Sequence, residues 1–173
     1  MDRKLPRFIR IIIPVFAAVV IAGSALILLW LHGAFLPRWI KWNRDVSDVI
    51  PEGVKYKLSD DWIIQNAVVF DIDGCGEDET VLLVWKRGSY GRLRPTWVKR
   101  DEIGFSQHIF IYKDQGNEGW RPIWMSSRLF FEAADFSVGD EIKGAGRRSL
   151  DTVSPDGDVT RWGWLSWGLV EVD

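Results

Sequence analysis

The sequence VVFDIDGCGEDETVLLVW, from Val68 to Trp85, decides the fold of this chain. Both ends of the stretch are apolar and rich in β-branched residues, a composition that favours extended strands. Its middle is acidic and carries two glycines, which is typical of a tight turn between strands. We therefore predict a β-hairpin whose loop spans residues 71–79.

The acidic residues of this loop have the spacing of a cation site. Asp71, Asp73 and Glu79 occupy positions 1, 3 and 9 of the loop, and carboxylates spaced in this way can converge on Ca²⁺ at about 2.4 Å. Position 5 is Cys75, whose thiol is a soft ligand that Ca²⁺ does not favour. Two interpretations stand side by side: a weak Ca²⁺ site, and a hairpin turn whose carboxylates are solvated.

Residues 70–83 also resemble a known calcium loop. They are similar to the loops of FG-GAP repeats, the integrin-α-type and VCBS β-propeller family, which run D-x-D-G-D-G-x-x-[DE] between two strands. Cys75 stands where that family has an acidic residue. The chain as a whole resembles short, membrane-anchored bacterial proteins, which implies no activity. For the loop, the resemblance implies Ca²⁺ held by the side chains of Asp71, Asp73 and Glu79 and by the main-chain carbonyl of Glu77.

The N-terminal part of the chain contains a candidate membrane anchor. From Ile11 to Leu31 there are 21 residues without a charge, enough at about 1.5 Å per residue to cross a hydrocarbon core of about 30 Å. A cleaved signal peptide is the alternative, but its apolar region runs for only about 7 to 15 residues. Four basic residues precede the run, which favours a cytoplasmic N-terminus. We expect an uncleaved single-pass anchor in the plasma membrane, with the C-terminal domain outside the cytoplasm.

The composition of the chain limits its partners and its chemistry. The formal net charge is −2, but residues 40–173 hold 17 basic and 23 acidic residues and are therefore acidic. Nucleic-acid binding needs a basic stripe, so we exclude nucleic acid as the partner. Cys75 is the only cysteine, which excludes an intramolecular disulfide, a CxxC redox pair and a cysteine zinc cluster.

Further strand patterns follow the central hairpin and indicate the fold class. They predict a second hairpin, a third hairpin over an Asp-Gly turn, and a last strand. Residues 126–136 fit either a strand or a helix. We therefore predict a mainly β fold, with one transmembrane helix and one antiparallel domain of about eight strands that is propeller-blade-like or sandwich-like. The strand patterns lie at residues 107–113, 120–125, 149–153, 159–164 and 168–172.

The expected organisation has four parts, and the last of them has too few strands for a closed propeller. Eleven tryptophans are present in the 173 residues, and we expect most of them to pack in the core of so small a domain. The parts are a cytoplasmic head at 1–10, the transmembrane helix at 11–31, a juxtamembrane neck at 32–64 and the exported β domain at 65–173.

A basic and aromatic stretch after the central hairpin is a candidate ligand surface. Its cations could contact acidic groups while its rings stack on sugar faces. The alternative is a solvated loop whose charges balance the acidic domain. The candidate residues are Lys86, Arg87, Tyr90, Arg92 and Trp97. A second sugar platform could form from Trp162, Trp164 and Trp167, although rings at strand spacing more often fill a core.

The sequence contains no complete catalytic set. Cys75 and His108 could form a thiol–histidine dyad if their side chains come within hydrogen-bond reach. Asp60 and Asp61 could form an acid pair, although adjacent acids before a strand are typical of a turn. We expect His108 to be a hydrogen-bonded structural residue. The predicted function is a non-enzymatic, membrane-anchored module that binds a protein or a cell-wall glycan; the alternatives are a cell-envelope hydrolase and a structural subunit of a membrane complex.

Overall fold

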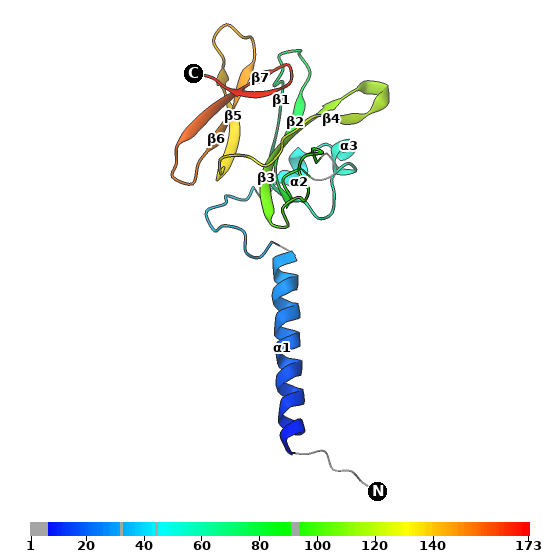
Figure 1. The fold of residues 1–173 in the computed structure, drawn as a ribbon. Coiled ribbons are helices and arrows are strands. Elements are labelled where there is room, and N and C mark those ends of the chain that lie inside the picture. The colour runs from blue at the N-terminus through cyan, green and yellow to red at the C-terminus, as the bar shows by residue number, and fades with distance from the viewer. Residues whose placement is uncertain (1–6, 32, 44, 91–93) are drawn as a thin grey trace. The chain divides into compact units, whose positions relative to one another are not determined.

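The computed structural model describes residues 7–31, 33–43, 45–90 and 94–173, which belong to two compact units with a boundary between Leu36 and Pro37. Figure 1 shows the elements of each unit. The first unit contains α1 (Arg7–Leu31). The second contains α2 (Val46–Val49), α3 (Glu52–Lys55), β1 (Ile63–Phe70), β2 (Glu79–Arg87), β3 (Phe105–Asp114), the 3-10 helix η2 (Gly116–Glu118), β4 (Trp120–Met125), β5 (Asp135–Glu141), β6 (Arg148–Val153), β7 (Val159–Leu165) and β8 (Gly168–Glu171).

The helix α1 contains the whole of the predicted apolar run. Its segment Ile12–Leu31 has 20 residues and a mean hydropathy of 2.7, and a helix of that length spans about 30 Å, the thickness of a hydrocarbon core. The Ser24 hydroxyl donates a hydrogen bond to the Val20 carbonyl one turn earlier (2.8 Å), so this polar group is satisfied within the helix. The helix is therefore long and apolar enough to be a membrane anchor or a signal sequence.

Four strands form the first antiparallel sheet, in the order β1-β2-β3-β4. The predicted central hairpin is β1 and β2, and the last residue pair before its loop is Phe70 with Glu79. On the other edge of β2, Thr80 pairs with Tyr112 and Val84 pairs with His108. The strand β2 is buried along nearly its whole length, which explains why its sequence is a continuous apolar run and not an alternating one.

The remaining strands form a second antiparallel sheet, in the order β5-β6-β7-β8, and the two sheets share one hydrophobic core. Leu83 of β2 and Ile111 of β3 contribute to this core from the first sheet, while Leu150 of β6 and Trp162 of β7 contribute from the second. Each such buried side chain stabilises the fold by about 1.5–3 kcal/mol relative to exposure. The shared core therefore makes the eight strands one structural unit.

The opposite face of the first sheet is covered by residues that precede β1. Ile50 and Val54, beside and within the short helices, are buried together with Leu82 of β2 and Phe110 of β3. The segment expected to form a juxtamembrane neck, 32–64, thus supplies part of a second core cluster. With both faces covered, the central strands β2 and β3 form a rigid base for the loops at their ends.

Buried glutamines fix the chain where it passes from the first sheet to the second. The Gln107 amide nitrogen donates to the Ala133 carbonyl (2.7 Å), and its amide oxygen accepts from the Ala133 backbone amide (2.8 Å). The Gln65 amide nitrogen donates to the Ala134 carbonyl (2.7 Å). Because buried backbone groups must find partners, these two side chains allow an irregular segment to run through the interior.

The predicted mainly β fold, with an N-terminal apolar helix and about eight antiparallel strands, is confirmed. The strands lie in two separate four-stranded sheets, shown side by side in Figure 1. Residues 126–136, which fitted either a strand or a helix, are an irregular linker up to Asp135, where β5 begins. Trp162 and Trp164 are core residues, whereas Trp167 is 70% exposed, so the three rings do not share one platform.

Candidate functional site

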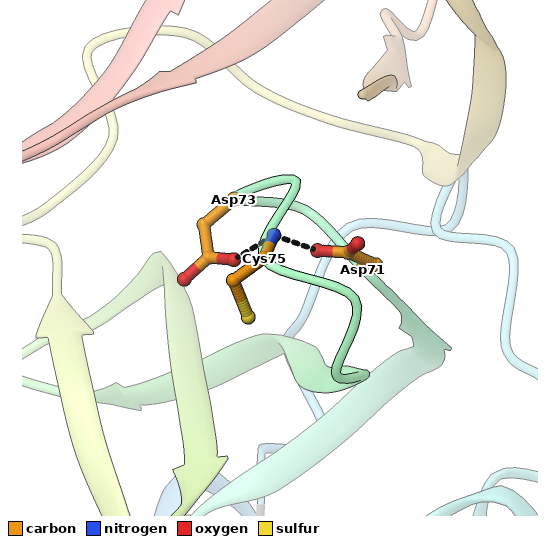
Figure 2. A group of neighbouring side chains, drawn as sticks. All are labelled: Asp71, Asp73 and Cys75. Atoms are coloured by element: carbon orange, nitrogen blue, oxygen red, sulfur yellow. Dashed lines mark hydrogen bonds between the residues drawn. The ribbon is translucent and has the colours of Figure 1, made fainter. Parts of the chain in front are cut away.

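The loop between β1 and β2 is folded around the carboxylate of Asp71. Its Oδ1 accepts hydrogen bonds from the amides of Gly74 (2.7 Å) and Cys75 (3.0 Å), and its Oδ2 accepts from the Gly76 amide (2.7 Å). Figure 2 shows the Cys75 amide between the carboxylates of Asp71 and Asp73, and Asp73 Oδ1 lies 3.0 Å from that amide. Gly74 and Gly76 have φ values of 77° and 91°, a region that favours glycine. The loop is therefore held by its own carboxylates and amides.

A lysine that the sequence analysis did not single out contacts three residues of the predicted ion site. Lys113 lies next to the last residue of β3, beside the start of β2. Its Nζ atom lies 2.9 Å from Asp73 Oδ2, 2.5 Å from Glu79 Oε1 and 2.9 Å from Cys75 Sγ. The Glu79 side chain is fully buried and that of Lys113 is only 15% exposed. One ammonium therefore connects the loop to the neighbouring strand.

The surroundings of these groups shift their pKa values. Burial alone would lower the pKa of Lys113, but its hydrogen bonds to Cys75, Glu79 and Asp73 raise that pKa well above the ordinary range. Burial opposes ionisation of Asp73, yet the hydrogen bonds from Lys113 and Cys75 hold the pKa of Asp73 below its usual value. Burial raises the pKa of Glu79, although Lys113 and the Ile72 amide act against it. The ammonium accordingly stays charged at neutral pH.

Two further observations concern the predicted ion site. Glu77 is exposed, and its main-chain carbonyl lies 3.9 Å from the Cys75 sulfur, which donates to it. Asp71, Asp73 and Cys75 each offer a ligand atom within 4.8 Å of the others. Acidic groups near a protein surface often lie this close without an ion, so this cluster is not evidence of bound Ca²⁺.

No family model, curated protein or solved structure matches this chain. The similarity of residues 70–83 to FG-GAP loops therefore stays a prediction from those residues alone. The function has to be inferred from the loops and surfaces of the chain itself.

His108 is a buried residue of β3 with hydrogen-bond partners on both ring nitrogens. Its Nδ1 lies 3.1 Å from the Ser126 carbonyl oxygen, and its Nε2 lies 2.8 Å from the Ser106 hydroxyl. Burial, with the nearby Lys86 charge, lowers the pKa of His108 to about 4. His108 is paired with Val84, which lies about 16 Å along β2 from the loop that carries Cys75. The structure does not bring Cys75 and His108 together.

The candidate ligand residues, at the end of β2 and in the loop that follows it, differ in burial. Lys86 is buried, and its ammonium donates to the Gly88 carbonyl (3.1 Å), so it faces the interior. Arg87 donates to the Ile103 carbonyl (3.0 Å) and its guanidinium lies 4.5 Å from the centre of the Phe105 ring. Arg92 lies outside the described residues. The two aromatic candidates are on the surface: Tyr90 is 38% and Trp97 is 81% exposed.

The loop that joins β2 to β3, residues 88–104, is closed at its base. The Gly88 amide donates to the Gly104 carbonyl (3.1 Å), and the Asp101 carboxylate accepts from the Ser89 amide (2.7 Å) and the Tyr90 amide. Farther along the loop, a turn is closed by a hydrogen bond from the Val98 amide to the Pro95 carbonyl (3.0 Å). Trp97 lies within that turn, so its exposed side chain projects from a hydrogen-bonded segment.

A cleft of about 360 Å³ adjoins this loop, between it and the linker that joins the two sheets. Tyr90 and Phe130 line it, together with the ion pair of Glu102 and Arg128 (2.9 Å). Phe130 is 89% exposed although it contacts Phe131 edge-on, with ring centres 5.0 Å apart. Of these residues, Tyr90 was predicted from the sequence, whereas Arg128 and Phe130 were not, because they lie in the linker, which has no clear strand or helix pattern. Two adjacent phenylalanines in a polar segment were the available signal.

Proposed function

We propose that this protein is a single-pass membrane protein whose β domain is a non-enzymatic binding module for an acidic glycan of the cell envelope. The domain is proposed to lie outside the cytoplasm and to contact its ligand through residues 94–100 of the loop between β2 and β3. The observation that carries the proposal is the combination of an exposed indole, Trp97, with exposed basic side chains on one hydrogen-bonded loop of an acidic domain.

The membrane part of the proposal rests on α1 and on the charges around it. The helix has the length and hydropathy of a membrane span. Four basic residues precede the apolar run in the sequence, and this bias favours a cytoplasmic N-terminus with export of the chain that follows. An anchored domain stays close to the cell envelope, so a modest intrinsic affinity is sufficient for its ligand.

The charges of the loop support an anionic ligand. Arg94, Lys99 and Arg100 are exposed, and among the residues that the structure describes none of the three forms an ion pair. The acids of the loop are engaged elsewhere, Asp101 with backbone amides and Glu102 with Arg128. Because residues 40–173 are acidic as a whole, a local basic loop is where an anion would meet least repulsion.

The exposed indole of Trp97 supports a ligand whose anionic groups are carried by a sugar. A flat indole ring stacks on the apolar face of a sugar, and its N–H group can donate a hydrogen bond to a polar neighbour. Carboxylated or phosphorylated sugars present such faces beside negative charges. An acidic protein surface would use the same bases, and it is the alternative partner that the experiment below distinguishes.

The test is a binding titration of the full-length chain in nanodiscs of zwitterionic lipid with polygalacturonate, a soluble polymer of carboxylated sugars, and with neutral dextran as reference. We expect binding of polygalacturonate alone, weakened by salt because exposed charges are screened beyond about 8–10 Å. Trp97→Ala should weaken it about tenfold, or about 1.4 kcal/mol, and Lys99→Glu with Arg100→Glu should abolish it. The matched control is Trp167→Ala, which removes another exposed tryptophan and should bind like the wild type.

Equal binding by the wild type and Trp97→Ala would overturn the proposal, because the loop would then play no part. Absence of polygalacturonate binding, with a cross-link from position 97 to a membrane protein, would favour the protein partner. Turnover of the polymer, lost on a single substitution, would favour the hydrolase alternative.

A further inference from the structure

We propose that the ammonium of Lys113 is the resident cation of the β1–β2 loop, so that residues 71–79 fold without a metal ion. The resemblance to calcium loops predicts a divalent ion at this place. The geometry of the described side chains disagrees with that prediction. The inference is independent of the ligand proposed for the β2–β3 loop.

The hydrogen-bonding capacity of Lys113 matches the groups around it. A lysine ammonium has three N–H donors and no acceptor. Its three partners here are Asp73 Oδ2 (2.9 Å), Glu79 Oε1 (2.5 Å) and Cys75 Sγ (2.9 Å). All three residues are ones that the sequence pattern places at ion-ligand positions. A single tethered cation therefore satisfies them together.

The carboxylate oxygens expected to bind an ion are already engaged. Both oxygens of Asp71 accept from loop amides, and Asp73 Oδ1 accepts from the Cys75 amide. Glu79 Oε2 accepts from the Ile72 amide (3.0 Å), and the last two oxygens accept from Lys113. Ca²⁺ takes six to eight oxygen ligands at about 2.3–2.6 Å, so it would have to displace the Lys113 ammonium, which already lies against Asp73 Oδ2 and Glu79 Oε1. The arranged residues do not fit that ion.

Burial explains why the loop needs a cation at all. The Glu79 side chain has no exposed surface, and a buried carboxylate without a counter-charge is costly. Its partner amide belongs to Ile72, whose side chain lies in the core shared by the two sheets. Loss of the Lys113 charge would thus disturb both the loop and the adjoining core.

Cys75 fits a lysine better than it fits calcium. A thiol is a weak hydrogen-bond acceptor, and it can accept from an ammonium at 2.9 Å, as it does here. The acidic residue that the calcium family has at this position would add another negative charge to the loop. A monovalent ammonium in place of a divalent ion matches a loop with one acid fewer.

The experiment measures the thermal unfolding of the full-length chain in detergent, with about 5 mM Ca²⁺ or with a chelator. We expect the same midpoint in both conditions for the wild type. Lys113→Met should lower the midpoint by about 10 °C with the chelator, as expected for a broken buried ion pair. Lys143→Met, which removes an exposed lysine of the β5–β6 turn, should leave the midpoint unchanged.

A second variant keeps the inference testable if Lys113→Met does not fold. Asp73→Asn removes the negative charge of one of the three partners and should lower the midpoint by less, again without a response to Ca²⁺. A wild-type midpoint that rises with Ca²⁺, with the rise lost in Asp73→Asn, would overturn the inference. So would a Lys113→Met protein that is as stable as the wild type.

Discussion

The Nζ atom of Lys113 lies 2.5 Å from Oε1 of Glu79, a carboxylate whose side chain is completely buried. The two residues come from neighbouring strands, and their contact closes the end of the first sheet at which the β1–β2 loop emerges. A loop that the sequence alone marks as a calcium site is thus held by a cation of the same chain. The order of this loop should not depend on Ca²⁺ in the surrounding solution.

If Lys113 excludes Ca²⁺, removing it and restoring the missing acid should create a calcium site. Lys113→Met combined with Cys75→Asp should bind Ca²⁺ with a dissociation constant of about 10⁻⁴ to 10⁻³ M, the range of extracellular modules. Isothermal titration calorimetry of the full-length chain measures this. The matched control is Cys75→Asp alone, which keeps Lys113 and should give no binding heat. Equal heat from both variants would show that the lysine is no obstacle to the ion.

The buried imidazole of His108 should make the domain unstable in mild acid. Burial lowers its pKa from 6.5 to about 4 on folding, so between these values the unfolded chain binds more protons than the folded chain. The free energy of unfolding therefore falls as the pH falls from 6.5 to 4, by about 3 kcal/mol in total. Urea denaturation at a series of pH values measures the slope.

The control for this pH dependence is His108→Gln, which keeps a polar, hydrogen-bonding side chain that does not titrate. Its free energy of unfolding should be lower near pH 7 and should change less between pH 6.5 and 4. The same slope in both proteins would mean that His108 is not the group responsible.

Gln107, a buried residue of β3, should contribute strongly to the free energy of unfolding. Gln107→Leu removes both hydrogen bonds to Ala133, which leaves the buried Ala133 amide without a partner at about 1–3 kcal/mol and leaves the Ala133 carbonyl only the longer hydrogen bond from Gln65 (3.3 Å). We expect a loss of about 3 kcal/mol in the free energy of unfolding, measured by urea denaturation. Gln115→Leu, in the exposed turn after β3, is the matched control and should change it by less than about 0.5 kcal/mol.

Chemical labelling of Cys75, the single cysteine, tests the proposed orientation of the chain in the membrane. Cys75 is exposed, so a membrane-impermeant maleimide should label it in cells whose plasma membrane is intact. A chain with Cys75→Ser and Asp2→Cys should be labelled only after the plasma membrane is opened. The reverse pattern would place the β domain in the cytoplasm and contradict the proposed location.

Local sequence patterns were sufficient to predict most of the fold. Alternating or continuous apolar residues, bounded by Gly, Asp and Asn, marked the hairpins because strand formation and turn chemistry depend on neighbouring residues. The uncharged run from Ile11 to Leu31 was equally clear. The linker before Asp135 was not predictable, because it is held by the distant side chains of Gln65 and Gln107.

The candidate sites were predictable only in part, because some of their contacts join residues that are far apart in the sequence. Asp71, Asp73 and Glu79 were found from spacing within one loop, whereas Lys113 reaches them through the pairing of β2 with β3. The register of two strands was needed to see that contact. Lys86 looked like part of a basic surface, but in strand β2 its side chain is buried. Trp97 could be found because a tryptophan between Pro95 and basic residues has no strand pattern to bury it.

Photo-crosslinking in living cells tests the central claim, that the β2–β3 loop meets an envelope glycan, most directly. A photoreactive aromatic side chain, which keeps a ring for stacking, would replace Trp97 in one protein and Trp167, which is 70% exposed on the β7–β8 turn, in another. We predict heterogeneous glycan adducts from position 97 and few from position 167, with a decrease when Lys99→Glu and Arg100→Glu are added. Glycan adducts of equal yield from both positions, or none from position 97, would contradict the account.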